Sequence, residues 1–157
     1  KYTFPEIKGT LILSGNPTPS LLRRIAKSNA REFIIHKGFV PRPDLLELYQ
    51  GCKALFFPSL FEGFGIPIVE AMKYDKPIFC SDLSVFRELI GDAPTYFNPN
   101  SIDEMVEHFI KIFGNKAVQP VNFKEYQVIL KKFNWGECAR NTIKLLKSVA
   151  DSGAGNQ

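Results

Sequence analysis

Residues 58–70 read Pro-Ser-Leu-Phe-Glu-Gly-Phe-Gly-Ile-Pro-Ile-Val-Glu, a pattern typical of a turn that leads from a strand into a helix. The run Ala54–Phe57 before it is short, apolar and stopped by a proline, which predicts a buried strand of a parallel sheet. Pro67 suits the first turn of a helix, and Gly63 and Gly65 allow unusual backbone dihedrals close to a bound group. A strand, a glycine turn and a helix N-terminus bring unpaired N–H groups to one spot. The stretch therefore predicts an anion site.

Two glutamates flank this anion site. Glu70 falls about one turn into the predicted helix, where its carboxylate can accept hydrogen bonds from a vicinal diol such as a ribose. Glu62 precedes the glycine turn, on the other side of the expected phosphate position. Phosphate in the middle with hydroxyls on both flanks describes a nucleotide-sugar. Either feature alone has a simpler explanation, because a glutamate in a first helical turn is favourable without any ligand and Gly-x-Gly turns occur in many loops.

The stretch resembles the E-x7-E signature of the retaining glycosyltransferases of family 4, which have the GT-B fold. The resemblance continues through Lys76–Ile78, Arg87–Ala93 and Phe97–Pro99, and it covers residues 10–150. It implies an α/β fold with a Rossmann-like parallel sheet and flanking helices, as in the C-terminal half of a GT-B glycosyltransferase. The sequence departs from the family at Asp75, where a glycine is usual, but aspartate tolerates the left-handed turn expected there.

The resemblance implies transfer of a glycosyl group from a nucleoside diphosphate sugar to a glycan or lipid-linked acceptor, with retention of configuration. Glu62 is then the catalytic residue, which contacts hydroxyls of the donor sugar. The donor is held by Gly63, Phe64, Gly65, Ile66 and Glu70. The chain has no Asp-x-Asp pair, and its three cysteines form no metal-ligand spacing, so we expect neither a metal nor a cofactor.

Two further loops are expected at the same edge of the sheet, because open α/β sheets bind ligands beyond the carboxyl ends of their strands. The first contains Gly15 and the second contains Gly38, Phe39 and Val40. By resemblance, the second loop contacts the nucleobase through backbone groups and the side chain of Phe39 or Val40, with Lys37 and Arg42 flanking it.

Short apolar runs recur along the chain, each followed by a turn and a helical pattern, which predicts a parallel α/β sheet. The predicted strands are Thr10–Ser14, Glu32–His36, Ala54–Phe57, Pro77–Cys80 and Thr95–Phe97. The predicted helix starts are Thr18-Pro19, Pro43, Pro67 and the capping box Ser101–Glu104. Two later stripes with helical spacing, both interpreted as core, are Phe123, Tyr126, Leu130 and Phe133, and Trp135, Ala139, Thr142, Leu146 and Val149.

The predicted nucleotide-sugar-binding domain spans residues 1–150, and the small polar residues 151–157 predict a disordered tail. The family pattern implies a further strand–helix unit before the first predicted strand, and an N-terminal domain that binds the acceptor. We expect both to be missing from these 157 residues. A Rossmann-like sheet has its first strand near the centre, so its loss should leave a gap or an exposed strand edge. The chain is then a fragment, or a partner chain completes it.

The net charge of +4 is unevenly distributed, with eight Lys or Arg and two acidic residues between Lys111 and Lys147. This excess predicts peripheral contact of the basic C-terminal helices with an anionic membrane surface, with an ordinary solvated face as the alternative. No helix-turn-helix or aromatic-interleaved basic pattern supports nucleic-acid binding. No signal peptide is recognised, so we expect a cytoplasmic protein, at the inner face of a membrane if the basic helices bind there.

Three other functions compete with a transferase. A non-catalytic nucleotide-sugar-binding or scaffold module would keep the fold without turnover, and a GT-B sugar-nucleotide epimerase or phosphorylase would use it for other chemistry. A phospho-receiver domain has a similar length and sheet, but it needs acidic residues after its first strand and an aspartate after its third. Gly15-Asn16 and Pro58-Ser59 stand there instead, which argues against it.

Overall fold

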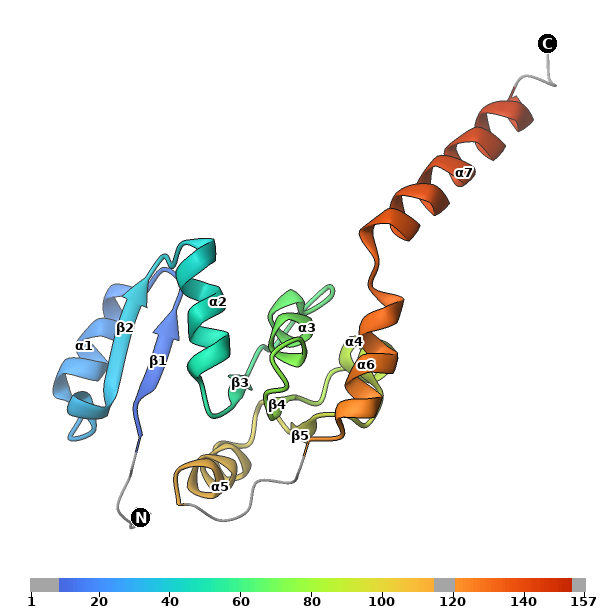
Figure 1. Ribbon diagram of the computed structural model, residues 1–157. Coiled ribbons are helices and arrows are strands. Elements are labelled where there is room, and N and C mark those ends of the chain that lie inside the picture. Colours follow the sequence, from blue (N-terminus) through green and yellow to red (C-terminus); the bar gives the residue numbers. More distant parts are fainter. Residues whose placement is uncertain (1–8, 115–120, 154–157) are drawn as a thin grey trace. The chain divides into compact units, whose positions relative to one another are not determined.

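The computed structural model of the chain describes residues 9–114 and 121–153. These residues form parallel β-sheets with flanking helices, which confirms the predicted α/β class (Figure 1). The chain divides into two compact units, Lys1–Val121 and Asn122–Gln157. The five strands found in the described residues all belong to the first unit.

The first unit begins with a two-stranded parallel sheet, seen in blue in Figure 1. Its strands are β1 (Leu11–Ser14) and β2 (Ile34–Gly38), joined by α1 (Pro19–Lys27) and the short 3-10 helix η1 (Arg31–Phe33). The hydroxyl of Thr18 accepts a hydrogen bond from the backbone N–H of Leu21 at 3.2 Å, which caps α1 where the sequence predicts its start. After β2 the chain enters α2 (Arg42–Gly51).

A second parallel sheet has three strands, in the order β3-β4-β5. These are β3 (Leu55–Phe57), β4 (Ile78–Ser81) and β5 (Thr95–Phe97), and the helices that alternate with them are α3 (Ile66–Met72), α4 (Ser84–Ile90) and α5 (Ile102–Phe113). Every residue of β4 is buried because this strand pairs on both sides. Phe56 stacks on Phe97 and on Phe109, with ring centroids 4.7 and 4.2 Å away, and packs against the buried core cluster of Phe79, Phe97 and Ile112.

The two sheets are not joined. Within the described residues, β1 pairs only with β2 and β3 pairs only with β4, so each has one strand edge without a neighbour. The residues of β3 are half-buried, whereas those of β4 are buried. This confirms the predicted gap or exposed edge.

An apolar cavity of about 230 Å³ also lies in the first unit. Its lining combines Leu11 of β1 and Phe33 and Ile34 near the start of β2 with Phe109 and Phe113 of α5. The side chains around this cavity therefore come from both sides of the interruption in the sheet.

The second unit holds α6 (Phe123–Lys132) and α7 (Trp135–Gly153). In α6, Tyr126 of the first predicted stripe is buried, as is its neighbour Ile129, but Phe123 of the same stripe is 56% exposed. The α7 stripe is exposed, with Trp135 at 85%. The prediction that the second stripe is core was therefore wrong, because the helical period identifies an apolar face and not what covers it. Residues 151–153, predicted to belong to a disordered tail, are part of α7, which continues through Gly153; residues 154–157 lie outside the described part of the chain.

Candidate functional site

The carboxyl ends of β1 and β2 bring two predicted site residues together. The backbone N–H of Gly15 donates to the carbonyl of Gly38 at 2.8 Å. Both glycines have positive φ, 106° and 65°, and no atom lies within 4 Å of where a Cβ would be. These residues therefore form an open turn at the edge of the sheet where a ligand is expected.

The loop after β2 carries the residues predicted to meet the nucleobase. Phe39 is 80% exposed, whereas Val40 is half-buried. An exposed phenylalanine at the carboxyl edge of a parallel sheet offers an apolar surface to a planar ligand. Arg42 follows as the first residue of α2.

The segment after β3 forms the glycine turn. The Oγ of Ser59 donates to Oε1 of Glu62 at 2.9 Å, which orients this half-buried carboxylate. Gly65 has a φ of 89° and is the N-cap of α3. The helix begins at Ile66, one residue before the predicted start at Pro67. Gly63 and Phe64 before the cap are exposed, and so is Ile66 after it. The turn therefore faces solvent while α3 behind it is buried.

Glu70 is the buried charge of this region, with 7% of the residue exposed. Nη1 of Arg42 donates to Oε1 of Glu70 and forms an ion pair with it. This hydrogen bond and the charge of Glu70 raise the pKa of Arg42. Burial and the charge of Glu70 raise the pKa of Tyr49 in α2. The Glu70 carboxylate is therefore held by the guanidinium of Arg42, from the same helix as Tyr49.

The pairing of Arg42 with Glu70 joins the second predicted loop to the third predicted segment. Sequence analysis placed Arg42 only as a flanking residue, because 28 residues separate it from Glu70. The available signal was topological: both residues follow the carboxyl ends of strands that face the same edge. No contact joins Glu62 to Glu70 among the interactions of the described residues.

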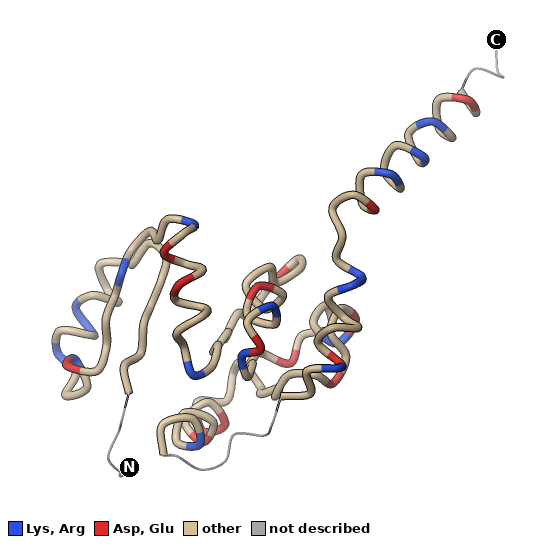
Figure 2. The backbone as a smooth tube through the Cα atoms, viewed as in Figure 1, with Lys and Arg blue, Asp and Glu red and all other residues tan. Residues whose placement is uncertain are grey.

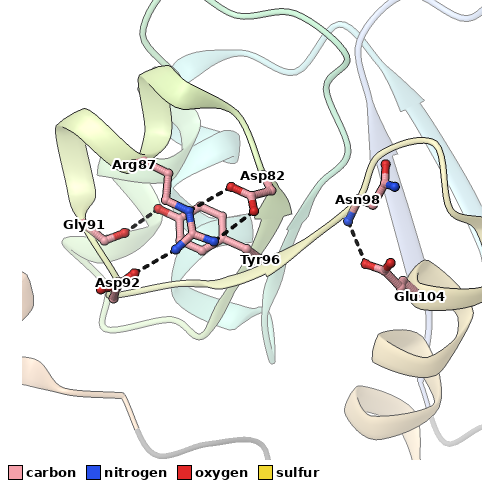
Figure 3. Close-up of polar contacts among 7 residues, drawn as sticks. All are labelled: Asp82, Arg87, Gly91, Asp92, Tyr96, Asn98 and Glu104. Atoms are coloured by element: carbon pink, nitrogen blue, oxygen red, sulfur yellow. Dashed lines mark hydrogen bonds and ion pairs between the residues drawn. The ribbon is translucent and has the colours of Figure 1, made fainter.

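A polar cluster around Arg87 closes the turn after β4 (Figure 3). Its guanidinium donates to both carboxylate oxygens of Asp82, at 2.8 and 2.9 Å, and to Asp92 at 2.7 Å. It also lies over the ring of Tyr96, 3.7 Å from the centroid, and the Tyr96 hydroxyl donates to the carbonyl of Gly91. The cluster links the end of β4, helix α4 and strand β5 through side-chain contacts.

Helix α1 carries only basic charges, Arg23, Arg24 and Lys27, whereas α7 has Glu137 and Asp151 towards its ends and Arg140, Lys144 and Lys147 between them (Figure 2). Within residues 9–114 and 121–153, no three His, Cys, Asp or Glu side chains are grouped so that they could hold a metal ion. In the same part of the chain, no helix has both the length and the apolar character needed to cross a bilayer.

Parallel α/β structure with the candidate residues at the carboxyl edge defines the class: the fold is that of the GT-B glycosyltransferases. The Anabaena protein HepE, solved in complex with UDP and glucose, matches 88% of this chain and 40% of its own with a TM-score of 0.74 and 21% identity. Sucrose-phosphate synthase from Thermosynechococcus elongatus matches 92% of this chain and 39% of its own, with a TM-score of 0.72 and 19% identity.

The chain belongs to the family "Glycosyl transferases group 1", whose model matches residues 5–129. It is 32% identical over 140 residues to O-antigen chain mannosyltransferase B of Escherichia coli, and 30% identical over 154 residues to the serotype-specific mannosyltransferase WbdA of the same species. These matches cover 87% and 92% of this chain, but only 37% and 19% of the relatives.

Proposed function

We propose that the protein transfers a glycosyl group from a nucleoside diphosphate sugar to an acceptor with retention of configuration, and that this chain supplies the donor-binding half. In this proposal the chain is a family 4 enzyme and Glu62 and Glu70 are its E-x7-E pair. The observation that carries it is the buried carboxylate of Glu70, paired with Arg42, in the helix that follows the exposed Gly63 and Phe64.

Each candidate residue has a proposed role. Glu70 accepts hydrogen bonds from the ribose diol, and the amides after Phe64 and Gly65 bind the diphosphate. Glu62, oriented by Ser59, contacts hydroxyls of the donor sugar as the catalytic residue. The remaining donor-binding residues are Gly15, Gly38, Phe39, Val40, Gly63 and Ile66.

We propose that the reaction needs neither a metal ion nor a cofactor. Backbone N–H groups and basic side chains then offset the charge of the leaving diphosphate, because pre-positioned dipoles stabilise charge that develops in a transition state. Activity that persists in excess EDTA would agree with this, and activity restored only by added Mg²⁺ would contradict it.

We propose that further residues complete the sheet and hold the acceptor. A parallel strand between β1 and β3 would pair both unpaired edges, giving the order β2-β1-x-β3-β4-β5. The apolar cavity between Leu11 and Phe109 supports this, since apolar side chains around a void favour an apolar neighbour. Peripheral membrane contact of the basic C-terminal helices stays a prediction.

The names of the relatives guide the choice of substrates. We propose mannose as the donor sugar and an O-antigen-type glycan or its lipid-linked form as the acceptor, because the two Escherichia coli relatives are mannosyltransferases and one is named for the O-antigen chain. The rates at which the full-length protein turns over mannosyl, glucosyl and N-acetylglucosaminyl donors should be compared with one another.

The experiment that tests the proposed function is nucleotide binding by the full-length protein and its Glu70→Gln variant. We expect the variant to lose about 1–3 kcal/mol of affinity for UDP or GDP, the range for hydrogen bonds to a charged group. Unchanged affinity would leave Glu70 with a role in stabilising α3 alone. Binding without turnover of any donor would favour the non-catalytic module, and turnover without an acceptor would favour an epimerase.

A further inference from the structure

Arg42 and Glu70 form an ion pair in which one partner is buried and the other faces solvent. The Glu70 side chain is 10% exposed and that of Arg42 is 60% exposed. An ionised carboxylate in a buried position is costly unless a counter-charge and hydrogen bonds compensate it. Arg42 supplies both, and it does so from the first residue of α2, directly after the loop of Phe39 and Val40.

The hydrogen-bonding capacity of Glu70 is not exhausted by this contact. An ionised carboxylate has about four acceptor positions on its two oxygens. Arg42 occupies one of them, at Oε1. About three positions remain. A vicinal diol has two hydroxyl donors, so Arg42 and a ribose can be bound by the same carboxylate at the same time.

We propose that Arg42 is a positioning residue of the donor site. Its guanidinium fixes the Glu70 carboxylate in the orientation that accepts both ribose hydroxyls, and the ion pair persists when the nucleotide is bound. This inference rests on the proposed role of Glu70 as the ribose ligand. In this proposal Arg42 supports recognition of the ribose. The alternative is that this exposed arginine binds the diphosphate directly, as arginines near phosphate sites commonly do.

A comparison of ligands with and without the diol separates these two tasks. Isothermal titration calorimetry with the full-length protein would measure binding of UDP, GDP and their 2′,3′-dideoxy counterparts. The variants are Arg42→Met, Arg42→Lys, Glu70→Gln and the double variant Arg42→Met/Glu70→Gln. Arg23→Met is the matched control, because Arg23 is an exposed arginine on α1. Thermal unfolding of each variant checks that it is folded.

The proposal predicts a selective loss. Wild type should bind the ribose form more tightly than the dideoxy form by about tenfold, and Glu70→Gln should remove this preference. Arg42→Met should weaken binding of the ribose form by about tenfold and leave that of the dideoxy form within about twofold. Arg42→Lys should recover part of the preference, because it keeps the charge without the planar guanidinium. The double variant should bind the ribose form no more weakly than Glu70→Gln does, because the two substitutions remove the same interaction.

Two results would overturn the assignment of Arg42. Equal losses for ribose and dideoxy ligands would place its guanidinium on the diphosphate, and an unchanged preference in Arg42→Met would leave it without a role in binding. Both differ from failure of the proposed function. In that case wild type shows no preference for the ribose form, Glu70→Gln binds like wild type, and the inference about Arg42 falls with it.

Discussion

Gly65 and Phe86 are packed so closely that no side chain fits between them. A Cβ built on Gly65 would lie 2.6 Å from Cε1 of Phe86, whose side chain is 1% exposed and has no room to withdraw. Gly65 also has a φ of 89°, in the left-handed region that L side chains rarely adopt. The glycine that caps α3 is therefore fixed by both backbone conformation and packing, and Phe86 of helix α4 packs against the glycine turn.

Gly65→Ala should destabilise the protein and disturb the turn. Left-handed backbone costs a non-glycine residue about 1–2 kcal/mol, and overpacking adds about 1–3 kcal/mol. Urea unfolding would measure the loss. Gly63→Ala is the matched control, because Gly63 lies two residues away with ordinary φ and nothing within 4 Å of a built Cβ. Equal stability of the two variants would contradict this account.

Arg87→Met should lower the Tm, because it removes the guanidinium that joins Asp82, Asp92 and the Tyr96 ring. Networks and bidentate pairs contribute more than single exposed ion pairs. Arg31→Met is the comparison, since Arg31 is an exposed arginine of the same unit. A Tm reduction no larger than that of Arg31→Met would show that the cluster does not stabilise the fold.

The contribution of Asp82 to the stability of the folded protein should decrease at acidic pH. Hydrogen bonding to Arg87 lowers the pKa of Asp82 below its ordinary value of 3.8. A carboxyl group whose pKa is lower in the folded state stabilises above its unfolded pKa, and this stabilisation is lost as the pH falls through the folded pKa. The Tm difference between wild type and Asp82→Asn should therefore be constant from about pH 7 to 5 and shrink below about pH 4. A difference that grows on acidification would contradict the sign.

The order of the elements could be predicted from the sequence because its signals are local. Thr95–Phe97 matches β5, and Asp75 has the expected left-handed φ of 55°. Helix α4 lacks the helix-start signals of the other helices, because its N-cap is Leu83, whose side chain makes no capping hydrogen bond. The capping box of α5 is only half formed. Ser101 accepts from the N–H of Glu104, but the Glu104 carboxylate accepts from Asn98 instead (Figure 3).

The contacts that support the site could not be predicted, because they join residues far apart in the sequence. Arg42 meets Glu70 across two elements, and Phe86 meets Gly65 from the next helix. A pattern of residues identifies which side chains can do chemistry, whereas their partners depend on how strands and helices are stacked. The same limit applies to α7, whose apolar face is clear from its period but whose exposure is not.

Glu62→Ala should weaken binding of the nucleotide-sugar by about 1–3 kcal/mol and leave binding of the free nucleoside diphosphate nearly unchanged. The reason is its place before the glycine turn, where its carboxylate accepts a hydrogen bond from Ser59, whereas Glu70 is paired with Arg42. Titration of both ligands into the full-length protein measures the difference. Glu88→Ala, an exposed glutamate on α4, is the control. Equal losses of affinity for the two ligands would show that Glu62 does not contact the sugar.

The 157-residue chain alone should bind nucleotides weakly and should not transfer a sugar. It spans 37% of the length of O-antigen chain mannosyltransferase B, and its two sheets leave edges of β1 and β3 without partners. A transferase must hold the acceptor against the anomeric carbon, and such positioning contributes about 7–11 kcal/mol to lowering the barrier. The full-length protein should regain both binding and turnover, measured side by side with the chain at equal concentration. Ordinary turnover by the isolated chain would mean that the whole active site, including the acceptor site, lies within residues 1–150.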